Sequence, residues 1–395
     1  MSQMRGLLLR VRDEDEARVT PLELFFDLVY VFAITQLSHL LLDRPTLGGA
    51  LQTLFLLLVV WWAWHYTAWF TNWFDPDALP VRLVLVGVML ASLVMSAAIP
   101  EAFGERGLMF ALAYVAVQAG RTAFSALALD ASHPRSGDSR RILVWFAASG
   151  VLWAAGGLSD GGARQALWLT ALLVDYAAPA ARYRTPGLGR SRTEEWRIEG
   201  AHIAERCQLF VIVALGESIL VTGATFAETE VSAATIAALA VAFVGSAALW
   251  WTYFARYARD ASETIARSPD PGSMARSAYA YSHIPIVAGI IAVAAADELL
   301  LAHPGEPGTS ASVSLTLGGT ALFVSGHALF VWSFSGRVPW SRFVAVGALA
   351  ALVPASFTMP ALFLALAAAL IVVLLGGWDS LGHHRGAGSP RRVAT

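Results

Sequence analysis

Long apolar runs separated by short polar segments dominate the sequence from residue 22 onward. Many of these runs approach 20 residues, and a helix of that length, at about 1.5 Å per residue, crosses a hydrocarbon core roughly 30 Å thick. The pattern predicts twelve helices, at residues 22–42, 48–72, 81–100, 107–129, 140–157, 163–183, 203–224, 232–255, 276–296, 313–334, 341–354 and 358–377. We therefore expect an all-α fold, a polytopic membrane helix bundle of about 12 transmembrane helices.

The composition agrees with a membrane protein and excludes several other classes. Of the 395 residues, 56% are hydrophobic and only 14% are charged, with a mean hydropathy of +0.58, whereas soluble domains carry about 25% charged residues. The net charge is −2 and the single cysteine is Cys207, so nucleic-acid binding and a disulfide framework are excluded. No phosphate-binding loop or haem motif appears in the sequence. We expect the lipid bilayer as surroundings, no nucleic-acid partner and no cofactor.

The distribution of arginine predicts the orientation in the membrane. Loops facing the cytoplasm carry an excess of basic residues. When the loops alternate from a cytoplasmic N-terminus, the inner segments hold 22 of the 27 basic residues and the outer loops hold 3. This asymmetry predicts a multi-pass protein of the cytoplasmic (inner) membrane with both termini in the cytoplasm.

The longest inner loop divides the predicted helices into six and six. We expect a cytoplasmic leader at 1–20, two six-helix halves at 21–183 and 201–378, a linker at 184–200 and a disordered tail at 379–395. Each half contains an acid followed by a pair of tryptophans, with 34 residues from Asp27 to Trp61 and 33 from Glu217 to Trp250. This similarity favours two parallel six-helix repeats, a plan found among transporters.

Ionisable residues inside the predicted helices are the candidate functional residues. A charge at the membrane centre costs about 2.5–3.5 kcal/mol on insertion scales, so such residues face each other or a water-filled cavity. The transport or proton-site candidates are Glu23, Asp27, Glu205, Arg206, Glu217, His283 and His327. Secondary polar candidates are Gln36, Arg121, Asp175 and His202.

Two interpretations of these residues remain open. Their arginines and acids could be buried ion pairs that only orient helices, or they could line a polar site that handles protons. In both cases Arg206 needs a carboxylate, and we predict that its helix packs on the first helix with Arg206 within reach of Glu23 or Asp27. Glu217 lies twelve residues, about 18 Å, beyond Glu205 on the same helix. There it either exchanges a proton, which we expect for a transporter, or stays neutral and donates one hydrogen bond to a neighbouring helix.

Several segments resemble one known family. In chain order they are LELFFDLVYVFAITQLSHLL, TNWFDPD, IPEAFG, HIAERCQLFVIVALGESIL and HIPIVAGI. Together they are similar to the bacterial low temperature requirement protein A (LtrA) family, and the resemblance covers roughly residues 18–378. It implies a multi-spanning membrane protein of a family named from a growth requirement in the cold. It supplies no substrate, cofactor or catalytic residue.

These observations favour a proton-coupled secondary transporter of an unknown small molecule or ion, and not an enzyme. Two alternatives remain, an ion channel and an intramembrane metal-dependent hydrolase that uses His202, His283 and His327. The hydrolase would need three ligands about 2.0–2.2 Å from one zinc ion, and no metal site is assigned from the spacing. The sequence leaves the substrate, the coupling ion and association into homo-oligomers open.

Overall fold

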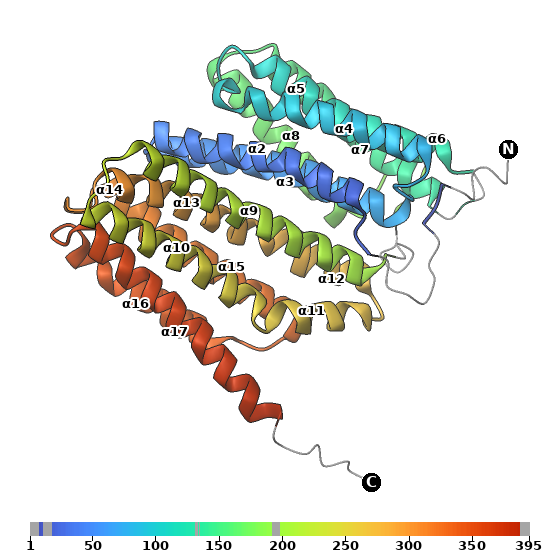
Figure 1. Ribbon diagram of the computed structural model, residues 1–395. Coiled ribbons are helices and arrows are strands. Elements are labelled where there is room, and N and C mark those ends of the chain that lie inside the picture. Colours follow the sequence, from blue (N-terminus) through green and yellow to red (C-terminus); the bar gives the residue numbers. More distant parts are fainter. Residues whose placement is uncertain (1–7, 11–17, 131–132, 134, 192–197, 388–395) are drawn as a thin grey trace, which may run out of the picture. The chain divides into compact units, whose positions relative to one another are not determined.

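The described part of the chain is helical almost throughout, as Figure 1 shows. The computed structural model describes residues 8–10, 18–130, 133, 135–191 and 198–387. Within these ranges the β contacts are isolated antiparallel bridges, Leu9 with Phe74, Thr185 with Gly189 and Pro307 with Pro360. The predicted all-α fold is confirmed.

Nine helical segments among the described residues are long and apolar enough to cross a membrane. They are Pro21–Asp43, Leu47–Trp73, Leu79–Glu101, Gly107–Ala128, Gly200–Glu228, Ala233–Ala266, Pro271–Ala302, Ser310–Ser335 and Ala361–Ser380. Trp340–Ser356 is a shorter apolar helix. The helices over 136–157 and 161–180, which contain the buried polar residues Asp138, Arg164 and Asp175, are not among the nine. The count of twelve spans and the six-plus-six repeat stay predictions.

The helices fall into two compact units, of which the first comprises Met1–Arg206 and Ser268–Ala275. Its helical elements are α2 (Pro21–Asp43), α3 (Leu47–Trp73), α4 (Leu79–Ala98), η1 (Ile99–Glu101), α5 (Gly107–Val115), η2 (Ala116–Gly120), α6 (Arg121–Ala128), α7 (Ser136–Gly157), α8 (Gly161–Ala180), the beginning of α9 (Gly200–Glu228) and α12 (Pro271–Met274). In this unit α2 packs against α3 and α4, and α7 packs against α5 and α8.

The second unit comprises Cys207–Arg267 and Arg276–Thr395. Besides the rest of α9, its elements are α10 (Ala233–Phe254), α11 (Tyr257–Ala266), most of η4 (Ala275–Tyr281), α13 (His283–Ala302), α14 (Ser310–Val313), η5 (Ser314–Gly318), α15 (Gly319–Ser335), α16 (Trp340–Ser356) and α17 (Ala361–Ala387). Helix α13 packs on α15, and α10 packs on α17. The contact between α13 and α15 is close, because a Cβ at Gly289 would lie 2.5 Å from the backbone nitrogen of Phe323.

The compact units and α17 have their own boundaries along the chain. The two units divide within α9, between Arg206 and Cys207, and the six-helix halves joined by a linker at 184–200 stay a prediction. Helix α17 continues to Ala387, so a disordered tail starting at residue 379 is wrong for residues 379–387, while 388–395 lie outside the described residues. The apolar run before Asp379 propagates the helix into a segment whose glycines and histidines suggested its end.

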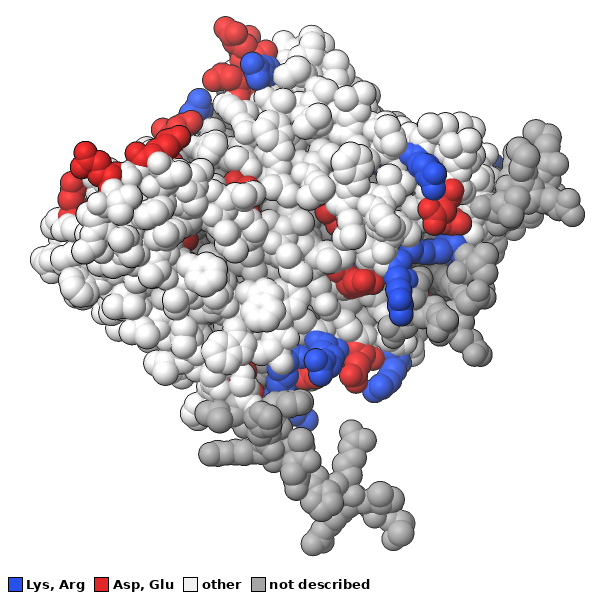
Figure 2. Space-filling view, viewed as in Figure 1, with Lys and Arg blue, Asp and Glu red and all other residues white. Residues whose placement is uncertain are grey.

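The surface has the character that a lipid environment requires. Large apolar side chains are strongly exposed, among them Phe243 and Leu374 of the second unit and Leu90 and Leu173 of the first. On the face drawn in Figure 2, charged side chains gather towards the margins and are sparse between them. In water such exposed apolar area would be costly, and the chain is accordingly a membrane protein.

Candidate functional site

Two carboxylates lie on the buried face of the first turns of α2. Thr20 caps this helix in a capping box, in which its side chain accepts a hydrogen bond from the backbone N–H of Glu23 and the Glu23 carboxylate accepts one from the backbone N–H of Thr20 at 2.8 Å. Asp27 follows one turn later on the same face. Both acids are 1% exposed. The local sequence therefore fixes the helix start and buries both carboxylates.

Arg206, in the second turn of α9, is the cation for these acids. Its Nη2 donates to Asp27 Oδ1 at 2.7 Å, and its Nη1 lies 3.8 Å from Glu23 Oε1. The Trp64 indole N–H donates to the same Asp27 oxygen at 2.7 Å, and the guanidinium lies 5.7 Å from the rings of Trp64 and Phe26. The prediction that Arg206 reaches Glu23 or Asp27 is confirmed.

His202 lies between Glu23, Arg10 and Asn72, and its charge follows from Asn72. The Asn72 amide oxygen accepts from the Glu199 backbone N–H at 2.9 Å, and its nitrogen donates to the Glu199 carbonyl at 2.8 Å. The same nitrogen lies 3.1 Å from His202 Nδ1, so Nδ1 accepts. Nε2 lies 2.8 Å from Glu23 Oε1, an acceptor, and 2.8 Å from Arg10 Nη1, a donor. Because an imidazolium has no accepting nitrogen, His202 is neutral in this arrangement.

A short piece of the leader is built into the first unit. The backbone N–H of Arg10 donates to the carbonyl of Trp73 at 3.0 Å, and the backbone N–H of Asp75 donates to the carbonyl of Leu8 at 2.9 Å. These two bonds tie the leader to the end of α3. The sequence predicts a cytoplasmic leader here, and its charged residues do not indicate this pairing with the end of α3.

The backbone bonds of residues 8–10 to the end of α3 place a second arginine, Arg10, next to Glu23. Arg10 Nη2 lies 3.6 Å from Glu23 Oε2, and Nη1 lies 2.8 Å from His202 Nε2. The guanidinium also donates to the backbone carbonyls of Thr71, at 3.0 Å, and Arg18, at 2.7 Å. The Arg10 side chain is 10% exposed, whereas that of Arg206 is fully buried. Sequence reasoning missed Arg10, since no periodicity links it to α2 or α9.

Arg10, Glu23, Asp27, His202 and Arg206 form what we call the buried charge network. Two ionised acids, two arginines and a neutral imidazole give it a net charge of zero. Its hydrogen bonding is incomplete, because Asp27 Oδ2 and the Nε and Nη1 of Arg206 make no hydrogen bond to the described residues. An ion pair that serves packing alone is stable only when its remaining donors and acceptors are satisfied. The network therefore has capacity for further polar contacts.

Two other candidates lie beside this network or apart from it. Glu205 is partly buried and accepts a hydrogen bond from the backbone N–H of Val19 at 3.3 Å, so it holds the residues just before α2. Gln36 is partly buried on α2 and makes no side-chain hydrogen bond to the described residues. The structure thus brings four predicted residues into the network, and Glu205 is next to it.

Arg121 and Asp175 are linked through neutral side chains and not as an ion pair. Arg121 Nη2 donates to Gln118 Oε1 at 2.5 Å, Gln118 Nε2 donates to the Tyr114 hydroxyl at 3.1 Å, and that hydroxyl donates to Asp175 Oδ2 at 2.9 Å. Arg121 also donates to Thr67 Oγ1 at 2.6 Å. A direct pair between a buried arginine and Asp175 is thus wrong, because an amide and a phenol span the distance between the two charges.

The second unit holds the two histidine candidates. His283 Nδ1 lies 2.9 Å from the carbonyl of Ala278, which can only accept, so Nδ1 carries the proton and Nε2 accepts from the Tyr253 hydroxyl at 2.7 Å. His327 Nδ1 accepts from Arg342 Nε at 3.4 Å. Both rings are fully buried and contact Tyr253, with ring centroids 5.7 Å and 6.1 Å away.

Arg342 has a carboxylate partner that the sequence did not suggest. Its Nη1 donates to Asp379 Oδ1 at 2.7 Å, and its Nη2 donates to Asp379 Oδ2, which makes a bidentate pair between α16 and α17. The Tyr257 ring lies 4.6 Å from the guanidinium. This buried pair makes residue 379 part of the fold.

Glu217, the deepest predicted acid, is buried on the part of α9 that belongs to the second unit, where it is 2% exposed. Its predicted role in proton exchange remains a prediction. As for metals, the described residues contain no group of three His, Cys, Asp or Glu side chains placed to hold an ion. The hydrolase alternative therefore gains no support from the geometry.

Three π-helical turns adjoin buried polar groups. η2 contains Gln118 and precedes Arg121, η4 supplies the Ala278 carbonyl that accepts from His283, and η5 contains Thr316. A π turn adds a residue to the helix, shifts the side-chain register and frees backbone carbonyls, and such turns are often found at functional sites. No residue pattern in the sequence predicts these turns.

Comparison with known proteins gives the following matches. The model of the family described as "Bacterial low temperature requirement A protein (LtrA)" matches residues 18–376. An "Uncharacterized protein RA0937" of Rhizobium meliloti (strain 1021) is 38% identical over 385 residues, which cover 95% of this chain and 93% of that protein. No solved structure matches.

Proposed function

Because the chain belongs to the bacterial low temperature requirement A (LtrA) family, a family of multi-spanning membrane proteins, we propose that it is a proton-coupled secondary transporter of a small solute or ion. Its place is the cytoplasmic membrane, with both termini and the 184–200 loop in the cytoplasm. The observation that carries the proposal is the buried charge network, which is neutral, incompletely hydrogen-bonded and closed by the leader. Ionisable groups at membrane depth commonly serve ion and proton pathways.

The charge balance of the network defines the proton-coupled step. When Asp27 takes up one proton on Oδ2, the oxygen that makes no hydrogen bond to the described residues, the network holds two arginines against one remaining carboxylate. A surplus buried charge is costly, and the arginine that can leave most easily is Arg10, whose side chain is already 10% exposed. Proton uptake by Asp27 is therefore coupled to departure of Arg10.

Departure of Arg10 opens the end of the first unit. Its side chain holds the carbonyls of Thr71 and Arg18, and its backbone holds Trp73. When these contacts release, the leader leaves the ends of α2 and α3, and the polar atoms of Asp27 and Arg206 gain access to water. When the acid releases this proton, the network is neutral again and Arg10 can return to its closed position. A two-state element of this kind is what coupling a proton to a solute requires.

The test is solute-dependent proton flux in liposomes that contain the purified protein and an internal pH dye. A pH gradient is applied, and candidate solutes are screened for those that accelerate its collapse. We expect Asp27→Asn to abolish the solute-dependent flux, because the variant keeps the neutral form permanently. Asp77→Asn is the control, since Asp77 is exposed and outside the network. Flux in Asp27→Asn equal to that of the wild type would overturn the proposed coupling.

Glu217 supplies a second test of the same proposal. Glu217→Gln keeps the shape of the side chain and removes its titration. If Glu217 passes the proton onward, this variant inserts normally and loses coupled flux. Normal flux in a well-expressed Glu217→Gln protein assigns Glu217 a packing role.

The orientation has its own test in cysteine labelling. In a Cys207→Ser background, we expect a membrane-impermeant maleimide to label Gly305→Cys on intact cells and to leave Arg190→Cys unlabelled. Both positions are exposed in the structure. The reverse pattern would place the 184–200 loop outside.

A further inference from the structure

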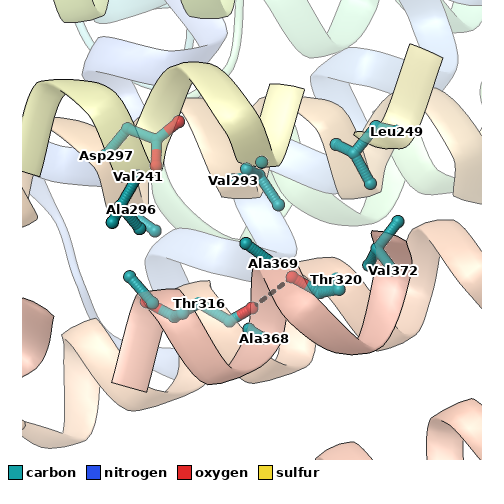
Figure 3. A pocket seen from close by; sticks show the side chains of 12 residues that line it. Val241, Leu249, Val293, Ala296, Asp297, Thr316, Thr320, Ala368, Ala369 and Val372 are labelled. Atoms are coloured by element: carbon teal, nitrogen blue, oxygen red, sulfur yellow. Dashed lines mark hydrogen bonds between the residues drawn. The ribbon is translucent and has the colours of Figure 1, made fainter. Parts of the chain in front are cut away.

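A cavity in the second unit contains a buried acid that plays no part in the contacts described above. It lies between α10, α13, η5, α15 and α17 and has an empty volume of about 390 Å³, its opening included (Figure 3). Small apolar residues form most of its wall, such as Val293, Ala368 and Ala369. Three of its lining residues carry side-chain oxygens, namely Asp297, Thr316 and Thr320. Mostly apolar walls with a few placed polar groups are typical of ligand sites.

Asp297 is the charged group of this cavity. It is 7% exposed, and its Oδ2 is buried and makes no hydrogen bond to the described residues. The described residues that line the cavity include no arginine, lysine or histidine. A buried carboxylate without a cation is costly, and the described residues of the cavity wall supply none. A small cation that enters the cavity would stabilise the charged form of Asp297.

The hydroxyl groups determine what kind of cation fits. Thr320 Oγ1 donates its hydrogen to the carbonyl of Thr316 at 2.6 Å, the dashed line in Figure 3. Its lone pairs can then only accept. Asp297 as a carboxylate also only accepts. Asp297 and Thr320 Oγ1 thus present hydrogen-bond acceptors to the cavity, which is complementary to a ligand with several N–H donors.

We propose that this cavity binds a small ammonium-type cation, either ammonium or a short primary alkylammonium. The N–H groups are donated to the Asp297 carboxylate and to Thr320 Oγ1, and a short alkyl group lies against Ala368 and Ala369. Hard metal cations such as Ca²⁺ take six to eight oxygen ligands, more than the three oxygen-bearing side chains here provide. The site lies within one unit and does not depend on the proposed proton coupling.

Thermal unfolding of the detergent-solubilised full chain tests this site at constant ionic strength. Ligand that binds only the folded state raises the unfolding midpoint, so we expect methylammonium chloride to raise it by about 5 °C at saturation. Sodium chloride and tetramethylammonium chloride, which lack N–H donors, should give no such rise. Asp297→Asn should lose the shift completely. We expect this variant to fold, because it removes a buried charge and keeps the shape.

Two further variants make the result specific. Glu298→Gln changes the neighbouring acid on α13, which does not line the cavity, and should keep the full shift. Gly245→Ala narrows the cavity, since its new Cβ would lie 4.0 Å from the Ala369 Cβ. We expect this variant to weaken the binding of methylammonium more than that of ammonium. The proposal is overturned if methylammonium leaves the wild-type midpoint unchanged, if Asp297→Asn keeps the shift, or if sodium produces the same shift.

Discussion

Asp27 and Asp297 are both buried carboxylates in apolar helices, and their surroundings are opposite. Asp27 accepts from Arg206 and Trp64, each at 2.7 Å. Asp297 lines a cavity with no cationic side chain among its described lining residues. Both acids are thus buried, and the supply of a partner differs. The role of an ionisable residue in a membrane helix therefore depends on which side chains the neighbouring helices place next to it.

The difference between the two acids arises from the residues that surround each of them. The buried charge network draws on the leader, α2, α3 and α9, so that large polar side chains from distant segments meet at one place. Around Asp297 the neighbouring helices present alanine, glycine and valine instead. Small side chains leave space and offer no charge. The first region therefore supplies its own counter-charges, whereas the described lining of the second supplies none.

The strongest test of this contrast removes the cation of the paired acid. In Arg206→Met the carboxylate of Asp27 loses its partner, and breaking a buried pair in this way costs about 3–5 kcal/mol. We expect a large fall in the unfolding midpoint of the detergent-solubilised protein. Asp27→Asn combined with Arg206→Met should recover part of the loss, because no unpaired charge remains. A single variant as stable as the wild type would show that the pair is not needed for the fold.

A second test asks whether the stability lost on replacing a buried acid depends on its ion pairing or on the unit in which it lies. Asp379 lies in the same unit as Asp297, yet it is paired with Arg342. Asp379→Asn leaves Arg342 without its carboxylate, with an expected cost of about 2–4 kcal/mol. A chain shortened to residue 378 should be destabilised to a similar extent, whereas one shortened to residue 387 should match the full chain. Equal stability of the two shortened chains would contradict a structural role for residue 379.

A smaller effect is expected at the edge of the network. Arg10→Gln removes one of two arginines near Glu23 and keeps a partly exposed polar side chain, so we expect a loss of about 1 kcal/mol. Limited proteolysis should then cut the leader faster than in the wild type, because the contacts with Arg18 and Thr71 weaken. Arg82→Gln, at an exposed pair, is the matched control and should leave cleavage unchanged.

The smallest effect on stability is expected at Asp297. Without added amine, Asp297→Asn removes a charge that has no partner in the chain, so its free energy of unfolding should equal that of the wild type or exceed it by about 1 kcal/mol. The measurement is chemical or thermal unfolding in amine-free buffer. A loss as large as that of Arg206→Met would show that Asp297 is paired in the fold, and the contrast between the two acids would disappear.

Much of the helical framework and one key contact could be predicted from the sequence. Long apolar runs predicted the helices, because a run of about 20 apolar residues has few stable conformations other than a helix in a membrane. The cost of a buried charge predicted that Arg206 would reach Glu23 or Asp27. Both arguments depend on local sequence and on a general energetic rule, and neither requires knowledge of the packing.

The remaining features depend on packing that the sequence does not display. Arg10 joins the network through two backbone bonds to the end of α3, which leave no residue pattern. Arg121 and Asp175 are bridged by Gln118 and Tyr114, whose roles depend on the register shift of a π turn. Asp297 stands beside Glu298 near the end of α13, so it resembled a helix terminus. Only the arrangement of α10, α15 and α17 around it defines the cavity.

The separation of 179 residues between Glu23 and His202, and again between Asp27 and Arg206, sets the order of events during synthesis. At about 5–20 residues per second, the ribosome needs about 10–40 s to make that length of chain. Throughout this interval the first acidic helix exists while His202 and Arg206, two of its partners in the network, have not been translated. The nascent chain must therefore keep α2 in a provisional state until α9 emerges, and the first helix to be made is among the last to reach its final electrostatic surroundings.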